Sequence, residues 1–307
     1  MSRTTHLPVR RGGFVTDGGL ETDLIFHHGV DLPEFAAFPL LEHAEGRRLL
    51  RGYYDGYAEV AAASGSGLLL ESPTWRANPD WGAKLGYDAA ALDRINADSM
   101  RFLAGIADDW RAQVPEIRLV GVLGPRGDGY LASETDPIEA SEYHLPQVRA
   151  LARGGASEVV AYTLTGVAEA VGVAVAARRV GIPATVSFTV ETDGRLPDGM
   201  PLADAIGAVD AACAPAQFGI NCAHPTHIAA ALAAGGEWLE RIAVVRANAS
   251  RLSHAELDEA EELDDGNPEE LADEIRRLEV LLPALKVLGG CCGTDVRHIS
   301  AMWEVAA

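Results

Sequence analysis

The segment at 287–294 reads Val287-Leu288-Gly289-Gly290-Cys291-Cys292-Gly293-Thr294, a short apolar run that stops abruptly at polar and sulfur-containing residues. Such a run is typical of a buried parallel strand, because covering helices leave a strand of this kind little contact with water. The residues after the run then lie at the carboxyl end of the strand. The same pattern recurs along the chain, and this recurrence indicates the fold.

Eight apolar runs, each bounded by turn residues, predict eight strands. They are 13–16, 67–70, 117–123, 158–161, 184–190, 216–221, 242–246 and 286–290. Helical spacing separates them, as at 43–63 and 89–114, and Asn267-Pro268-Glu269-Glu270 has the composition of a helix start. Eight βα units in 307 residues predict one domain, 1–307, folded as a (β/α)8 TIM barrel. An open doubly wound sheet is the alternative, but no G-x-G-x-x-G follows the first strand.

The composition excludes several classes of partner. The formal net charge is −20, so the chain would repel nucleic acid and anionic membranes, whose binding depends on Lys and Arg contacts to phosphate. No apolar run approaches the length of a membrane span. Four cysteines in a chain this long are not typical of a disulfide framework and favour a reducing, cytoplasmic location. We expect small-molecule partners, and a homo-oligomer stays open.

Three of the four cysteines follow predicted strands. Cys222 ends the sixth strand, and Cys291 and Cys292 end the eighth, so all three sulfurs could meet at the carboxyl rim of a barrel. Adjacent residues of a strand face opposite ways, so both can face one metal only where the backbone turns, which Gly290 and Gly293 permit. Three thiolates would form a zinc site with one open position. The alternative is that these are buried apolar cysteines.

A zinc ion held by three thiolates carries a net charge of about −1 and activates water poorly. It is better suited to binding a substrate thiol as its fourth ligand, since a coordinated thiol loses its proton. This predicts alkyl transfer to sulfur in preference to hydrolysis. A metal hydrolase would need a histidine and carboxylate set, for which the sequence offers no convincing candidate.

Several motifs resemble those of the homocysteine S-methyltransferase family. They are Asp17-Gly18-Gly19-Leu20-Glu21-Thr22, Gly124-Pro125, Ser187-Phe188, Gly194-Arg195-Leu196-Pro197-Asp198-Gly199, Gly219-Ile220-Asn221-Cys222 and Gly289-Gly290-Cys291-Cys292-Gly293-Thr294. The resemblance covers essentially the whole chain. It implies a zinc-binding barrel that methylates a thiol in methionine biosynthesis, with Cys222, Cys291 and Cys292 as the Zn²⁺ ligands.

Two departures from the family pattern concern the acceptor. In the family, the fourth strand usually ends in Glu-Thr, and that Glu holds the amino group of the substrate, whereas this chain has Tyr162 there. Arg246-Ala247-Asn248 stands where the family tends to have Tyr-Pro-Asn. A neutral phenol cannot pair with an ammonium as a carboxylate does. The resemblance therefore implies a thiol acceptor, homocysteine or a related thiol.

Other rim residues are candidates for contacts with the ligands. Glu71 could replace the missing carboxylate and hold an ammonium or sulfonium, or it could be a structural rim residue. Trp75 and Trp81 could contact a cationic donor by cation–π attraction, or pack the loop. The predicted substrate-binding residues are Asp17, Gly18, Gly19, Glu21, Glu71, Tyr162, Asn221 and Asn248. No catalytic residue is predicted beyond the metal ligands.

The sequence thus predicts a zinc-dependent S-methyltransferase. Its methyl donor would be a sulfonium or a betaine-like ammonium, and its acceptor a small-molecule thiol. The alternative is a metal–thiolate barrel that binds a thiol ligand without methyl transfer.

Overall fold

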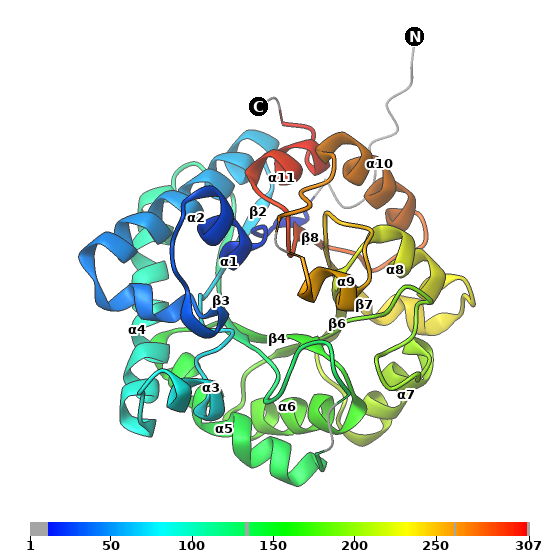
Figure 1. Ribbon diagram of the computed structural model, residues 1–307, viewed down its shortest axis with the longest axis horizontal. Helices are drawn as coiled ribbons and strands as arrows, with labels where there is room; N and C mark the ends of the chain where they lie inside the picture. The colour runs from blue at the N-terminus through cyan, green and yellow to red at the C-terminus, as the bar shows by residue number, and fades with distance from the viewer. Residues whose placement is uncertain (1–11, 133–134, 261, 306–307) are drawn as a thin grey trace.

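The computed structural model describes residues 12–132, 135–260 and 262–305. Its strands are parallel and close into a barrel in the order β1 to β8, with β8 paired to β1 (Figure 1). The strands are β1 Phe14–Val15, β2 Gly67–Glu71, β3 Ile117–Leu123, β4 Glu158–Leu164, β5 Ala184–Phe188, β6 Gln217–Ala223, β7 Ile242–Ala247 and β8 Val287–Gly290. The predicted TIM barrel is confirmed.

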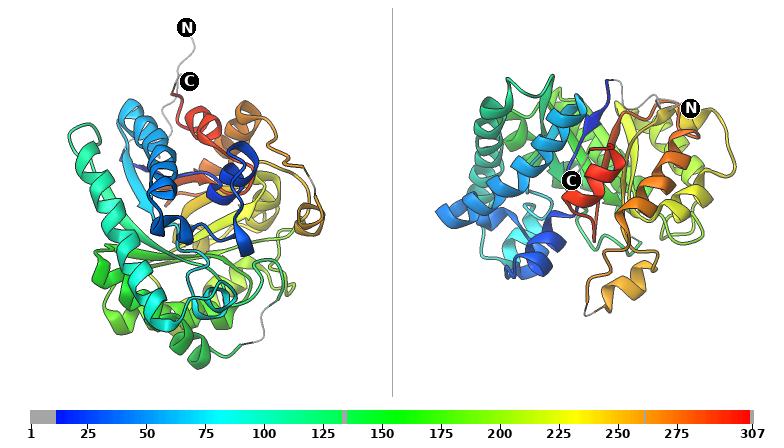
Figure 2. Two further views of the ribbon diagram at one scale, coloured as in Figure 1. Left: turned by 60° about the vertical axis from the view of Figure 1, so that its left-hand side comes forward. Right: turned by 90° about the horizontal axis from the view of Figure 1, so that it is seen from above.

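Helices surround the barrel on all sides (Figure 1). The longer ones are α2 Ala44–Ser64, α4 Ala89–Trp110, α5 Pro137–Gly154, α6 Val167–Val180, α7 Leu202–Cys213, α8 Pro225–Leu232, α10 Pro268–Glu279 and α11 Val296–Met302. Short segments lie in the connections: α1 Leu20–Thr22, η2 Asp23–His27, η3 Pro33–Phe35, η4 Phe38–Glu42, α3 Pro79–Lys84, η5 Glu237–Arg241 and α9 His254–Asp258. In the right-hand view of Figure 2, α9 projects from one end of the barrel.

The helix boundaries follow local rules of capping. Asn267 accepts hydrogen bonds from the backbone N–H groups of Glu269 and Glu270, which confirms the predicted start of α10. The helix predicted at 89–114 is shorter than expected, because α4 ends at Trp110 in a turn. None of the described helices is long and apolar enough to cross a lipid bilayer.

The apolar side chains form two separate cores. The larger core lies between the barrel and its helices and includes Tyr54, Phe38 and Met100. The smaller core contains side chains from several strands, among them Leu69, Val160 and Val244. Side chains of a strand alternate between the two faces, so the smaller core is the filling of the barrel interior.

The same alternation directs polar residues into the barrel at its carboxyl rim. Two residues after Leu69, Val160 and Val244 come Glu71, Tyr162 and Arg246, and all three are buried. Cys291 likewise follows Val287 by four residues, directly after the end of β8. The strands therefore present a polar layer above the apolar filling of the barrel, and this layer forms the site.

Candidate active site

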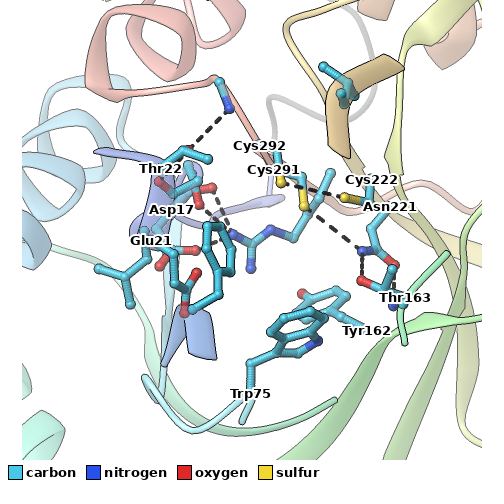
Figure 3. A pocket seen from close by; sticks show the side chains of 18 of the residues that line it. Asp17, Glu21, Thr22, Trp75, Tyr162, Thr163, Asn221, Cys222, Cys291 and Cys292 are labelled. Atoms are coloured by element: carbon cyan, nitrogen blue, oxygen red, sulfur yellow. Dashed lines mark hydrogen bonds and ion pairs between the residues drawn. The ribbon is translucent and has the colours of Figure 1, made fainter. Parts of the chain in front are cut away.

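The three predicted metal ligands converge at the rim. The sulfur atoms of Cys222, Cys291 and Cys292 all lie within 4.8 Å of one another, and those of Cys222 and Cys292 are 3.6 Å apart (Figure 3). Sulfur ligands about 2.3 Å from a tetrahedral zinc ion are separated by about 3.8 Å. The donor set thus fits zinc in both ligand type and spacing.

Cys222 reaches this position through an unusual backbone conformation. Its φ is 56°, in the left-handed region, and the register of β6 against β7 shifts at this point. Thr163 at the end of β4 has a φ of 61° beside a similar shift. Each such residue costs on the order of 1–3 kcal/mol, so the surroundings must hold it.

Asn221 ties the two strained strand ends together. Its Oδ1 accepts hydrogen bonds from the Thr163 backbone N–H at 2.9 Å and from Ser187 Oγ at 2.7 Å. Its Nδ2 donates to Thr163 Oγ1 at 2.9 Å. Asn221, predicted to bind substrate, therefore also fixes the backbone that carries Cys222.

Tyr130 and His254 close the site beside Cys222. Their rings stack with centroids 4.2 Å apart, and His254 Nε2 lies 2.7 Å from the Cys222 carbonyl oxygen. The Tyr130 hydroxyl lies 3.1 Å from Cys222 Sγ and 3.8 Å from Cys292 Sγ. A polar hydroxyl thus faces the sulfur cluster on the side of the β3–α5 connection.

Hydrogen bonding among the three thiols divides their acidities. Hydrogen bonds with Cys222 and Cys292 lower the pKa of Cys291 well below its usual range. The hydrogen bond with Cys291 raises the pKa of Cys222, against the opposing effect of Cys292, and hydrogen bonds with Cys222 and Cys291 raise the pKa of Cys292. This network favours Cys291 as the most acidic of the three thiols.

Gly18 and Gly19 let the β1–α1 connection pack closely against the cysteine turn. A Cβ on Gly19 would lie 2.5 Å from the Cys291 carbonyl oxygen, and one on Gly18 would lie 2.7 Å from that of Thr294. The Gly19 backbone N–H donates to Thr294 O at 2.9 Å. These glycines line the cavity and also hold the two loops together.

Asp17, Glu71, Tyr162 and Arg246 form a closed cluster of charged and polar groups. Arg246 Nη2 donates to Asp17 Oδ1 at 2.5 Å, and Nη1 donates to Glu71 Oε2. The Tyr162 hydroxyl donates to Glu71 Oε1 at 2.6 Å, and the guanidinium carbon lies 4.8 Å from the Tyr162 ring centroid. Both oxygens of Glu71 are thus engaged by internal partners, which favours the structural rim residue of the two alternatives given for it.

Arg246 also supports the cysteine turn. Its Nε donates to the carbonyl oxygen of Gly290 at 2.8 Å, one residue before Cys291, and its Nη2 donates to Gly18 O at 2.8 Å. Although burial alone would lower the pKa of Arg246, Asp17 and Glu71 raise it well above its usual range. Burial raises the pKa of Glu71 to about 7, against the opposing effect of Arg246. The cluster is therefore an internal ion-pair network. Its cation, Arg246, is the only charged residue of β7, a strand that the structure describes in full.

A cavity of about 380 Å³ lies beside the sulfurs. Its lining includes seven of the eight predicted binding residues, Asp17, Gly18, Gly19, Glu21, Glu71, Tyr162 and Asn221. In Figure 3, Asp17 and Glu21 lie on one side, Cys222 and Asn221 lie on the other, and Trp75 and Tyr162 lie between them. Asn248 is buried and is not among the described residues that line the cavity.

Glu21 and Arg76 are an open pair of charges on this cavity, because neither has an ion-pair partner among the described residues. Burial raises the pKa of Glu21 to about 7. Arg76 lies between the rings of Trp75 and Trp81, with its guanidinium carbon 4.1 and 3.6 Å from their centroids. Trp81 also contacts Lys84, whose Nζ lies 3.7 Å from its ring centroid. The two rings therefore contact cationic side chains of the protein itself, which favours the loop-packing alternative.

Three important residues were not singled out from the sequence. Tyr130 lies in the glycine-rich connection that follows β3, and Arg76 lies in a loop without regular periodicity. Arg246 was noted only as a departure from the family pattern. Its inward direction follows from its position two residues after Val244, so alternation along β7 was the available signal. His224 caps α8 by accepting from the Thr226 backbone N–H, and the described residues grouped as possible metal ligands here are the three cysteines alone.

The comparison with known proteins agrees with this arrangement. The family model for homocysteine S-methyltransferase matches residues 14–306. The chain is also similar to crystal structures of the homocysteine methyltransferase MmuM from Escherichia coli. The metallated form is 22% identical with a TM-score of 0.74 over 95% of each chain, and the oxidized form is 21% identical with a TM-score of 0.76 over 94% of each. At this identity the structural match supports the fold, whereas the family match spans almost the whole sequence. The protein is therefore an S-methyltransferase that belongs to the homocysteine S-methyltransferase family.

Proposed function

We propose that the protein transfers a methyl group from a sulfonium or betaine-like donor to a thiol, homocysteine or a related thiol, with Zn²⁺ on Cys222, Cys291 and Cys292. The observation that carries this proposal is the convergence of three cysteine sulfurs within 4.8 Å beside a cavity of about 380 Å³. When bound there, zinc would supply Lewis-acid stabilisation of the acceptor thiolate, which keeps the sulfur nucleophilic at neutral pH.

The residues of the chain supply position and electrostatics for the transfer. Asn221 and Arg246 hold the backbone on either side of the cysteine set, as their hydrogen bonds to Thr163 and Gly290 show. Aromatic rings of Phe35 and Trp75, with centroids 6.5 Å apart, form part of the cavity lining. Aromatic faces suit an onium methyl group and exclude water that would compete as a nucleophile.

Glu21 is the charged group that best fits the positive donor. Its carboxylate lines the cavity and has no ion-pair partner among the described residues. In the transfer, a lone pair of the acceptor sulfur forms the new bond to the methyl carbon. The bond between that carbon and the onium sulfur or nitrogen breaks, and its electron pair leaves with the neutral sulfide or amine. The positive charge on the donor therefore disappears as the reaction proceeds, and no redox partner is needed.

Purified protein supplied with a panel of thiols and onium donors would test the proposal. Mass spectrometry should detect a methylated thiol, and elemental analysis should find zinc. Cys291→Ser should lose zinc and most of the activity, whereas Cys213→Ala should retain both. Cys213 is a matched control because it is a buried cysteine at the end of α7, outside the cluster. Thiol binding without a methylated product would favour the binding-only alternative, and full activity of Cys291→Ser would exclude the proposed site.

We also propose a reducing, cytoplasmic location and, with homocysteine as acceptor, a part in methionine biosynthesis. Zinc-binding sulfurs must be reduced, and all four cysteines are free thiols in the structure. Cell fractionation would test the location.

A further inference from the structure

Arg76 lies in the connection between β2 and α3 and is only 8% exposed. Trp75 and Trp81 cover its guanidinium group, with ring centroids 4.1 and 3.6 Å from the guanidinium carbon. Stacking of this kind covers the faces of the guanidinium and leaves its N–H donors at the edge. Arg76 also lines the cavity beside the sulfurs.

The donors of Arg76 are almost entirely without partners. Among the residues that the structure describes, its hydrogen bonding is limited to a long bond of 3.4 Å from Nη1 to the carbonyl oxygen of Gly127. Its buried Nε has no partner at all. Buried arginines are normally paired, because an uncompensated buried charge is costly. Arg246, which lines the same cavity, has two carboxylate partners.

Nearby carboxylates do not account for this charge. Burial lowers the pKa of Arg76 to about 10, partly opposed by Asp128, Glu21 and Glu34. None of these carboxylates forms an ion pair with Arg76 in the described part of the chain. Glu34 pairs with Lys84 at 3.2 Å, and Asp128 accepts from the backbone N–H of Tyr130 at 2.7 Å. Arg76 therefore remains charged at neutral pH and faces the cavity without a counterion.

We propose that Arg76 binds a carboxylate of the ligand that enters the cavity, so that either the acceptor thiol or the methyl donor carries an anionic group. The guanidinium edge offers parallel N–H donors that match the two oxygens of a carboxylate, and the two indole rings hold that edge in one plane. This inference rests on the proposed function for the nature of the ligands. Arg76 is a specificity-determining residue in this account and takes no part in bond making.

Direct binding to the zinc-loaded full chain tests the inference without turnover. Calorimetry would compare 3-mercaptopropionate with 2-mercaptoethanol as thiols, and dimethylsulfoniopropionate with trimethylsulfonium as donors. In at least one pair, the compound with a carboxylate should bind at least about tenfold more tightly, as expected for a charge-assisted hydrogen bond. The pair that shows this preference identifies whether the acceptor or the donor carries the carboxylate.

The variants separate the role of Arg76 from general effects of charge. Arg76→Gln should remove the preference and leave the neutral compounds unchanged, and Arg76→Lys should retain only part of it. Arg153→Gln is the control, since Arg153 is an exposed residue of α5 paired with Asp93 at 2.8 Å, and it should bind as the wild type does.

Two results would overturn the inference. One is the absence, in wild-type protein, of any preference for the carboxylate compound in either pair. This result does not depend on the folding of a variant. The other is a preference that survives in folded Arg76→Gln. A protein that prefers carboxylates but yields no methylated thiol would keep this inference and reject the proposed function. A protein that methylates thiols without any carboxylate preference would support the proposed function and reject this inference.

Discussion

The cavity has two sets of charges that differ in how they are neutralised. In the closed cluster, Arg246 pairs with Asp17 and Glu71, and Tyr162 bonds the remaining Glu71 oxygen. In the open pair, Glu21 and Arg76 face the same cavity, and neither forms an ion pair within the described residues. The first set is completed by the chain itself, whereas the second leaves charge for a ligand to complete.

This difference distinguishes residues that stabilise the structure of the site from residues that we expect to bind its ligand. A buried ion-pair network fixes geometry and is costly to break, while an unpaired charge on a cavity is costly until a ligand binds. Tyr162 stands where the family usually has a ligand-binding Glu, and Arg246 fills the space beside it with an internal cation. We propose that Glu21 and Arg76 recognise the ligand charge instead.

The largest expected effect is on the closed cluster. Arg246→Met removes the shared cation and leaves Asp17 and Glu71 buried without it, which should lower the free energy of unfolding by about 3–5 kcal/mol. Arg76→Met, the matched change in the open pair, should alter it by no more than about 1 kcal/mol, because an unpaired buried charge is lost along with the ring contacts. Denaturant unfolding of the two variants measures both values. Equal losses of unfolding free energy in the two variants would contradict the distinction between the closed cluster and the open pair.

Tyr162→Phe tests the same cluster with a smaller change. It keeps the ring and leaves Glu71 Oε1 without its 2.6 Å hydrogen bond, so the free energy of unfolding should fall by about 1–3 kcal/mol. Thermal unfolding against the wild type would measure this loss. Tyr143→Phe, on α5 and outside the cluster, controls for the general effect of removing a partly buried tyrosine hydroxyl. A variant as stable as the wild type would show that the phenol does not support Glu71.

Glu21→Gln tests the open pair and should affect binding more than stability. The change is nearly isosteric and removes the negative charge that we assign to the donor. The Kd for trimethylsulfonium should rise about tenfold, the value of one charge-assisted contact. Titration calorimetry measures this change, with the unfolding midpoint as the check on folding. Unchanged affinity would remove Glu21 from the donor site.

The pH dependence of the same binding gives the smallest expected effect. Since the pKa of Glu21 is raised to about 7, its carboxylate is charged above that pH and becomes neutral below it. Affinity for trimethylsulfonium should therefore weaken roughly threefold from about pH 8 to about pH 6.5. The dependence should be absent in Glu21→Gln, so a slope common to both proteins would assign it to another group.

The regular parts of the molecule followed from the sequence. Continuous apolar runs marked the strands, because both faces of a parallel barrel sheet are covered. Cys222 and Cys291 were placed together because barrel strands end at one rim. The predicted strand ends differ from the observed ones where a strand continues past an irregularity, as β4 does at Thr163.

The rest depends on contacts between distant segments. The left-handed conformations of Thr163 and Cys222 could not be predicted, because neither residue is a glycine. Asn221 stabilises them only once β4 and β6 are close in space. The partners of Arg246 come from β2 and the end of β1, so its pairing requires the closed barrel. Arg76 meets its two tryptophans through the path of a loop, which no periodicity describes.

Zinc X-ray absorption of the full chain, with and without an acceptor thiol, tests the central claim most directly. The account predicts a sulfur shell at about 2.3 Å from the three cysteines, and one additional sulfur when the thiol binds. A protein without zinc, or a zinc site whose sulfur count does not change with a thiol that becomes methylated, would contradict it.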